Sequence, residues 1–193
     1  LEILQDFKDP EPNQKIVATP GHGTHVPVWL LGSSLFSAQL AARLGLPYSF
    51  ASHFAPRMLS QAVQLYRENF QPSEYLEQPY VSMGVPTVVA KTDAEAQHLA
   101  TSAYQRVLGL MRGQSLKLKP PVESMDHIWT PAERISVNNF YALGQIGSPE
   151  TVKAGLQDLL EHVDVDEFIF TCDIYDTEKR LENFSLLMDI KNS

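Results

Sequence analysis

Short apolar runs alternate with longer segments of helical periodicity along most of the chain. The apolar runs cover residues 28–31, 48–51, 80–90 and 167–174. Segments with apolar positions three and four residues apart follow them, over residues 34–44, 56–70, 92–112 and 177–190. This alternation predicts four strands, each followed by a helix. Repeated units of this kind are typical of an α/β fold with a parallel sheet.

Local capping signals support these helix boundaries. Gly45 follows the first helix, where a glycine commonly ends one. Thr92 and Glu95 have the spacing of a capping box ahead of the third helix. Ser148, followed by Pro149 at a first helical position, predicts a further helix before the last strand.

Two segments depart from the regular pattern. Pro86 lies inside the third apolar run. A central parallel strand uses every backbone N–H as a donor, and proline has none. We therefore expect a bulge at Pro86 or a strand that begins late. Residues 113–147 form a connector too long for a bare loop, and we expect an irregular excursion with short helices.

Four parallel strands cannot close a (β/α)8 barrel, which needs twice as many. The pattern therefore leaves an open α/β sheet or the second half of a barrel.

Composition narrows the classes of protein. The chain has 193 residues, of which 44% are hydrophobic and 20% charged, as in globular proteins. Its net charge of -8 repels a phosphate backbone, so we expect no nucleic-acid partner. Its apolar runs are far shorter than the roughly 20 residues of a membrane span. The single cysteine, Cys172, permits no intrachain disulfide and is expected to be a small buried residue.

The turn Gly32-Ser33-Ser34 is the strongest candidate for chemistry. It stands between the first strand and the first helix, where free backbone N–H groups and the helix dipole favour an anion. Glycine allows a phosphate close to the backbone, and two hydroxyls add donors. The alternative is that Ser33 or Ser34 only caps the helix. His53 follows the second strand, at the edge where such folds build their sites, or is a plain turn residue.

Other polar residues carry weaker signals. His22 and His25 have the spacing of a metal pair but stand in a Gly/Pro loop without nearby cysteine or carboxylate, so we predict no metal site. Asp164, Asp166 and Glu167 precede the last strand, at the end opposite any site. We expect them to form a solvated turn.

The stretch "VPVWLLGSSLFSAQLAARLGLPYSFASHFAP", residues 26–56, resembles the bacterial luciferase-like, flavin-dependent monooxygenase family. The likeness is strongest to a subgroup of small alkanal-monooxygenase-like oxidoreductases. It continues through "PYVSM", "MDHIWTPAE" and "GLQDLLEHVDVDEFIF" and so covers nearly the whole chain. The chain opens without an initiator Met, on what reads as a helix tail and a Pro-rich connector. We therefore interpret it as a piece of a longer protein.

The resemblance implies a TIM (β/α)8 barrel of the luciferase-like type. Residues 1–193 would be the C-terminal half of this single domain, carrying strands five to eight, with residues 113–147 as an excursion. The strands that carry most of the isoalloxazine contacts and the catalytic side chains would belong to the other half. In this chain the resemblance implies a site for the FMN phosphate and for its surroundings at Gly32, Ser33, Ser34, Leu35 and His53.

The resemblance also implies an activity. Reduced FMN, supplied by a separate NAD(P)H-dependent flavin reductase, would react with O₂ and oxygenate a small organic substrate. A homodimer and a cytoplasmic location are the corresponding expectations, the latter because no signal peptide is present. The alternatives are a relative that uses the deazaflavin F420, a non-catalytic flavin-binding protein, and an unrelated phosphosugar-binding α/β domain.

Overall fold

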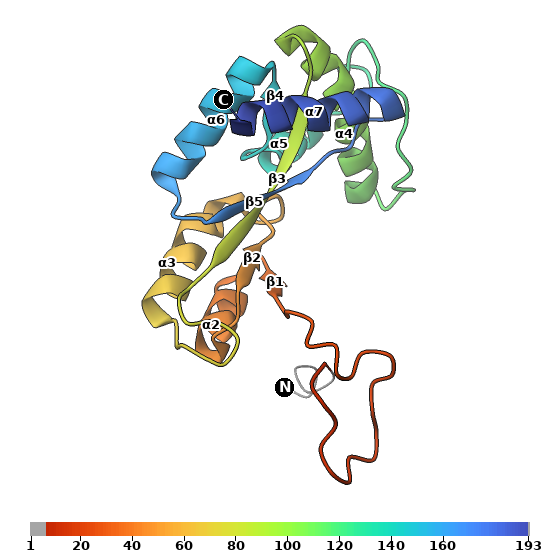
Figure 1. The fold of residues 1–193 in the computed structure, drawn as a ribbon. Helices are drawn as coiled ribbons and strands as arrows, with labels where there is room; N and C mark the ends of the chain where they lie inside the picture. Colours follow the sequence, from red (N-terminus) through yellow and green to blue (C-terminus); the bar gives the residue numbers. More distant parts are fainter. Residues whose placement is uncertain (1–6, 193) are drawn as a thin grey trace.

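Strand β3 (Val81–Val89) is the central strand of a parallel sheet in the computed structural model, which describes residues 7–192 (Figure 1). β2 (Tyr48–Phe50) and β5 (Glu167–Thr171) pair with its first part, and β4 (Gln145–Gly147) pairs with its end. β1 (Leu30–Gly32) extends the sheet beyond β2. Every one of these pairings is parallel, which confirms the predicted α/β class.

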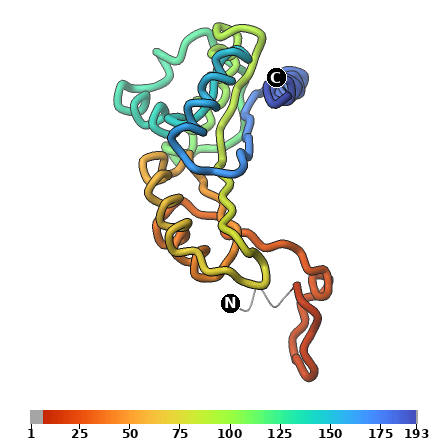
Figure 2. The backbone as a smooth tube through the Cα atoms, turned by 60° about the vertical axis from the view of Figure 1, so that its left-hand side comes forward, coloured from red at the N-terminus to blue at the C-terminus, as the bar shows by residue number. Residues whose placement is uncertain are grey.

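The helices complete the fold. In chain order they are α2 (Leu35–Leu44), the 3₁₀ turn η1 (Pro56–Met58), α3 (Leu59–Asn69), α4 (Asp93–Met111), α5 (Pro131–Phe140), α6 (Pro149–His162) and α7 (Thr177–Asn192). Helices α2, α3 and α6 share the main core with the sheet. Figure 2 shows α7 nearly end-on, beside β3. No helix in the described part of the chain has both the length and the apolar character to cross a membrane.

One face of the sheet packs against helices, and the other is exposed at β1 and β5 but buried along most of β3. Tyr48 and Phe50 of β2, with Met83 and Val85 of β3, are fully buried in the core beneath the helices. Because side chains alternate across a strand, the intervening residues point to the opposite face. Leu31 on that second face is 68% exposed. We call this second face the inner face of the sheet.

The capping predictions hold with one exception. Gly45 takes the left-handed conformation, with φ of 62°, at the end of α2, and the Ser148 hydroxyl accepts a hydrogen bond from the first turn of α6. Thr92 caps α4 by accepting from the Glu95 N–H. The reciprocal half of the box is missing, because the Glu95 carboxylate instead accepts from the Lys179 ammonium at 2.6 Å.

The connector contains more structure than expected. Residues 113–147 were expected to contain short helices, and the structure has one there, α5, which Thr130 and Glu133 start with a complete capping box. The prediction of four strands is wrong, since the described chain has a fifth, β4. Three residues are too short to show a strand period. β1 also starts two residues later than expected, and β5 ends three residues earlier.

The irregularity expected at Pro86 is absent, so that prediction is wrong. β3 begins well before the proline and keeps an unbroken register with β5 from Ser82 to Pro86. Successive residues of a parallel strand direct their backbone N–H and C=O groups to opposite edges. A donor can therefore be missing on one edge of β3 without disturbing the hydrogen bonds on the other edge.

The edge that Pro86 faces carries β2 and β4 at different heights. The Tyr80 C=O accepts from β2 and the Ala90 N–H donates to β4, so even-numbered residues point to this edge. Pairing with β2 ends at Met83, and pairing with β4 starts at Thr87. Pro86 thus lies in the gap between two partners, where no N–H is needed.

The acidic residues ahead of β5 are not simply solvated, contrary to expectation. Arg67 on α3 lies 2.8 Å from the Asp164 carboxylate and 2.9 Å from that of Asp166. Asp166 also accepts from the Val81 N–H at 2.7 Å. These contacts connect α3 to the first residues of β3 and β5.

Candidate functional site

The Gly32-Ser33-Ser34 turn lies where its sequence predicts, between the end of β1 and the start of α2. Ser34 is the N-cap, and its hydroxyl accepts from the Ser37 N–H at 3.2 Å. In return, the Ser37 hydroxyl accepts from the Ser34 N–H at 3.3 Å. The two serines thus form a capping box, so the Ser34 side chain is already engaged.

A buried tyrosine supports this box from the next strand. The Ser37 hydroxyl donates to the Ser34 C=O at 2.7 Å, and the Tyr48 hydroxyl lies 3.0 Å from the Ser37 oxygen. Burial raises the Tyr48 pKa, so the phenol remains a neutral donor. Our sequence reasoning missed both Ser37 and Tyr48. The Ser-x-x-Ser spacing was a signal for the first, whereas nothing local indicates the second.

Gly32 is required here for packing. A Cβ built on Gly32 would overlap the Cβ and the hydroxyl of Ser37. Its φ lies outside the left-handed region, so the glycine is not needed for its backbone conformation. The missing side chain is what lets Ser37 fold back over the turn.

Three donors of the turn remain for a ligand. The N–H groups of Leu35 and Phe36 belong to the first turn of α2, where helical N–H groups lack an intrahelical acceptor. The Ser33 hydroxyl makes no hydrogen bond within residues 7–192 and is half-buried. The first turn of α2 contains no acidic residue to repel an anion. This donor set fits a phosphate.

His53 lies at the same edge of the sheet as the turn. The Ala51 N–H donates to the Gly32 C=O at 2.9 Å, which aligns the ends of β1 and β2. The His53 ring is half-buried, with centroids 4.3 Å from Phe54 and 5.2 Å from Phe140. Its Nδ1 atom is buried and has no hydrogen-bond partner within the described residues.

The electrostatic surroundings keep the His53 imidazole neutral at pH 7. Burial is the main cause that lowers its pKa, and the Arg106 cation lowers it further. The Asp173 carboxylate opposes this effect. As a neutral ring, His53 can therefore donate one hydrogen bond and accept another.

A second polar cluster, which no local sequence pattern indicated, lies beyond the end of β5. Arg106 on α4 bonds to Asp173 through Nε at 2.8 Å. Burial raises the pKa of Tyr141, and its buried hydroxyl has no well-formed hydrogen bond within the described chain. The Arg106–Asp173 ion pair links α4 to the segment after β5.

The remaining candidates show no catalytic geometry. His25 lies 3.6 Å from the Asp9 carboxylate in the N-terminal loop. Residues 7–192 contain no group of three or more His, Cys, Asp or Glu side chains placed to hold a metal ion. Cys172 is half-buried, and burial raises the pKa of its thiol. A thiol of this kind is a poor nucleophile.

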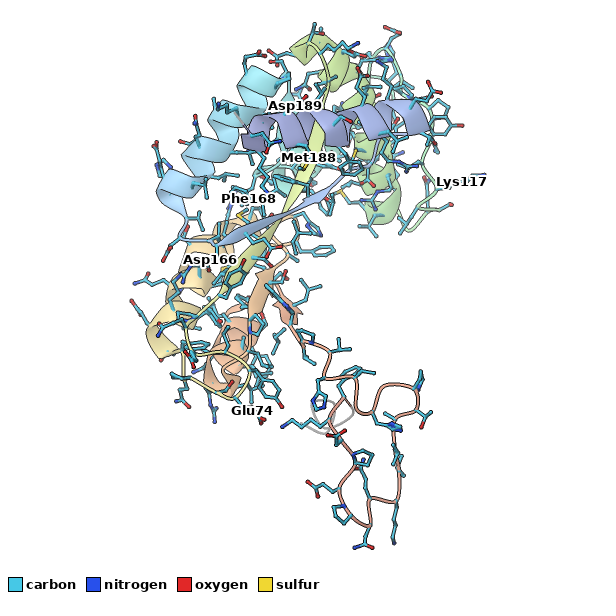
Figure 3. The ribbon with its side chains drawn as sticks, viewed as in Figure 1. Glu74, Lys117, Asp166, Phe168, Met188 and Asp189 are labelled. Atoms are coloured by element: carbon cyan, nitrogen blue, oxygen red, sulfur yellow. The ribbon has the colours of Figure 1, made fainter. Side chains whose placement is uncertain are left out.

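Two cavities lie away from the turn. One, of about 650 Å³, is lined by N-terminal-loop residues together with Pro47 and Tyr75. The other, of about 640 Å³, lies between α6, β5 and α7. Figure 3 shows two of its lining residues, Phe168 on β5 and Met188 on α7. Neither cavity contains the candidate residues of the turn.

Comparisons with known proteins agree with the resemblance seen in the sequence. The profile of the family described as luciferase-like monooxygenase matches residues 6–167. A luciferase-like monooxygenase of Escherichia coli K12 is 44% identical over 190 residues, which are 98% of this chain and 57% of that protein. The uncharacterized protein YvbT of Bacillus subtilis is 45% identical over 192 residues, with the same coverage. The chain thus spans little more than half the length of these relatives.

Solved structures share the fold. Apo-MsnO8 superposes with a TM-score of 0.76 at 26% identity, over 99% of this chain and 58% of that one. A second structure is the oxygenating constituent of 3,6-diketocamphane monooxygenase from Pseudomonas putida, in complex with FMN. It superposes with a TM-score of 0.58 at 18% identity, over 92% of this chain and 52% of that one. The F420-dependent tetrahydromethanopterin reductase of Methanopyrus kandleri superposes with a TM-score of 0.57 at 13% identity, over 95% of this chain and 57% of that one.

Proposed function

Because the chain belongs to the luciferase-like monooxygenase family, we propose that it carries the phosphate-anchoring half of a flavin-dependent monooxygenase. In this proposal the complete enzyme uses reduced FMN and O₂ to oxygenate a small organic substrate. The observation that carries it is the turn after β1, where the start of α2 offers the N–H groups of Leu35 and Phe36 beside the Ser33 hydroxyl. The FMN phosphate is the anion that we assign to this turn.

The individual roles in the turn follow from its hydrogen bonds. Gly32 keeps the backbone accessible, Ser33 supplies a hydroxyl donor, and Leu35 supplies a backbone donor at the positive end of the helix dipole. Ser34 acts mainly through the cap, because its hydroxyl is shared with Ser37. His53, at the end of the neighbouring strand, offers a neutral ring to the rest of the cofactor.

We also propose that residues 1–193 are the C-terminal half of a (β/α)8 barrel. The chain covers 57% of the length of its curated relatives. Within residues 7–192, β5 pairs only with β3, so its other edge is open to a further strand. Leu31 and Ile169, on the inner face, are 68% and 44% exposed. Strands of the other half would cover them and close the barrel.

In this proposal the cofactor, this chain and its partners have separate roles. The bound flavin supplies the redox chemistry with O₂. This chain's residues bind the phosphate and orient the cofactor. A flavin reductase delivers the reduced cofactor, and a homodimer is the proposed assembly. The catalytic side chains are assigned to the other half of the barrel.

The alternative cofactor is the deazaflavin F420. Structures with this cofactor share the fold, and the same turn would accept its phosphate as readily. A flavin-binding protein without catalytic activity is a further alternative. It predicts bound flavin but no oxygen uptake coupled to a product.

A titration of the full-length protein tests the proposal. FMN, riboflavin and F420 are added separately, and binding is followed by flavin fluorescence. We expect FMN to bind more tightly than riboflavin, because only FMN carries the phosphate. Equal affinity for FMN and riboflavin would contradict the phosphate assignment. Tighter binding of F420 would favour the alternative cofactor.

A further inference from the structure

Glu167, the first residue of β5, places a carboxylate on the inner face of the sheet. Its register partner on β3 is Ser82, and the next residue of β5, Phe168, packs with the main core beneath the helices. Because side chains alternate across a strand, Glu167 points to the opposite face, as Ile169 does. Glu167 is exposed in this chain. A charge therefore stands among the residues that the proposed barrel would enclose.

Two aromatic rings lie on the amino-terminal side of this carboxylate. Tyr80 immediately precedes β3, and Trp29 immediately precedes β1. The Tyr80 hydroxyl donates to the Glu167 carboxylate at 3.2 Å, and the ring centroids of Tyr80 and Trp29 are 5.6 Å apart in an edge-to-face contact. On the carboxyl-terminal side, the next residue of β5 on the same face is Ile169, which is 44% exposed. Glu167 thus has large apolar groups on both sides along the sheet.

The Tyr80 hydroxyl is the one hydrogen-bond partner that Glu167 has within residues 7–192. A carboxylate can accept about four hydrogen bonds, so most of its capacity is unused. The preceding residue, Asp166, is different, because its carboxylate lies 2.9 Å from the Arg67 guanidinium on the helix side of the sheet. No cation of the described chain forms such an ion pair with Glu167.

We infer that Glu167 forms an ion pair inside the closed barrel with a lysine or arginine side chain of the other half. This inference rests on the half-barrel arrangement of the proposed function and names a contact that joins the two halves. Side chains fill the interior of a (β/α)8 barrel, so the strands that cover Ile169 also remove Glu167 from water. An ionised carboxylate removed from water needs a cation and further hydrogen bonds to offset its lost hydration. Tyr80 supplies a hydrogen bond but no charge.

Urea unfolding of the full-length protein at pH 7 tests this inference with the Glu167→Gln variant. The amide keeps the shape of the carboxyl group but carries no charge, so it leaves the partner cation unpaired in the interior. We expect the equilibrium constant for unfolding to rise about a hundredfold, which corresponds to roughly 2.8 kcal/mol. Glu161→Gln is the matched control, because Glu161 is an exposed carboxylate on α6. It should change the constant by no more than about twofold.

A crystal structure of the full-length wild type decides the question if Glu167→Gln does not fold. We expect a lysine or arginine nitrogen of the other half within about 4 Å of the Glu167 carboxylate. A Glu167→Gln protein as stable as the wild type overturns the inference. So does a closed barrel in which Glu167 faces water or has only Tyr80 as partner, and both results leave the proposed function intact. A full-length structure in which the inner face stays uncovered overturns the half-barrel arrangement as well.

Discussion

The side chain of Ser37 occupies the space that a side chain on Gly32 would fill. This relationship joins the end of β1 to the first turn of α2 and fixes the shape of the turn between them. The cap residue, the proposed phosphate donors and the packing of the helix start therefore depend on one another.

Gly32→Ala should lower the free energy of unfolding by about 1–3 kcal/mol, the usual effect of overpacking. The added methyl group forces Ser37 away and breaks the capping box. Urea unfolding measures the change. Ser37→Gly removes the overlapping atoms, so the Gly32→Ala/Ser37→Gly double variant should be more stable than the sum of the single effects predicts. Strict additivity would show that the two residues do not compete for space.

The two serines of the turn should separate into different roles. Ser34→Ala removes the cap and should lower the free energy of unfolding by about 1 kcal/mol. Ser33→Ala should change stability by no more than about 0.5 kcal/mol, as for other substitutions away from structural contacts. It should nevertheless weaken FMN. Unfolding curves and flavin titrations on both variants check this. Loss of stability in Ser33→Ala and weaker FMN binding in Ser34→Ala would instead make Ser33 the cap and Ser34 the FMN ligand.

Asn183 should be required for stability although it is not one of the candidate site residues. Its side-chain oxygen accepts from the buried Val89 N–H at 2.7 Å, and the residue is 0% exposed. Asn183→Ala leaves that N–H unpaired, so the free energy of unfolding should fall by about 1–3 kcal/mol. The exposed Ser185 on the same helix provides the control. Ser185→Ala should be nearly neutral, and similar losses for both would contradict the assignment.

Glu133 should make stability depend on pH. Its bonds to Arg112, then to the Thr130 N–H, lower its pKa from 4.5 to about 2. Because the folded-state pKa is depressed, the contribution to stability is present above pH 4.5 and lost as pH falls towards 2. The stability gap between wild type and Glu133→Gln should therefore shrink over this window. A gap that stays constant between pH 5 and 2.5, measured by urea unfolding, would exclude this role.

Local chemistry explains which parts of the fold were predictable. Ser34, Thr92 and Ser148 act on N–H groups within three residues, so their helices were visible in the sequence. β4 was not, because its three residues become a strand only through pairing with β3, far away in the chain. The class of the sheet followed from the alternation of elements, whereas the first and last residue of each strand depended on its pairing with neighbouring strands.

The same distinction applies to the candidate site. The turn at residues 32–34 was predictable because a glycine and two serines between a strand and a helix are a local pattern. Tyr48 enters the site from the next strand, eleven positions beyond Ser37, so no local spacing identifies it. Gly84 comes close to His53 only through the fold, where a Cβ on Gly84 would lie 3.8 Å from His53 Nδ1. Pairing, not composition, brought these residues together.

The placement of Pro86 also has a consequence for how β3 finds its partners. A shift of one residue would turn the proline towards β5, whose ladder requires a donor there. Every side chain of β3 would also change face, exposing the core and burying Ser82 and Gly84 against the helices. The proline thus penalises misaligned sheets. The position of Pro86 therefore favours the observed register over one shifted by a single residue.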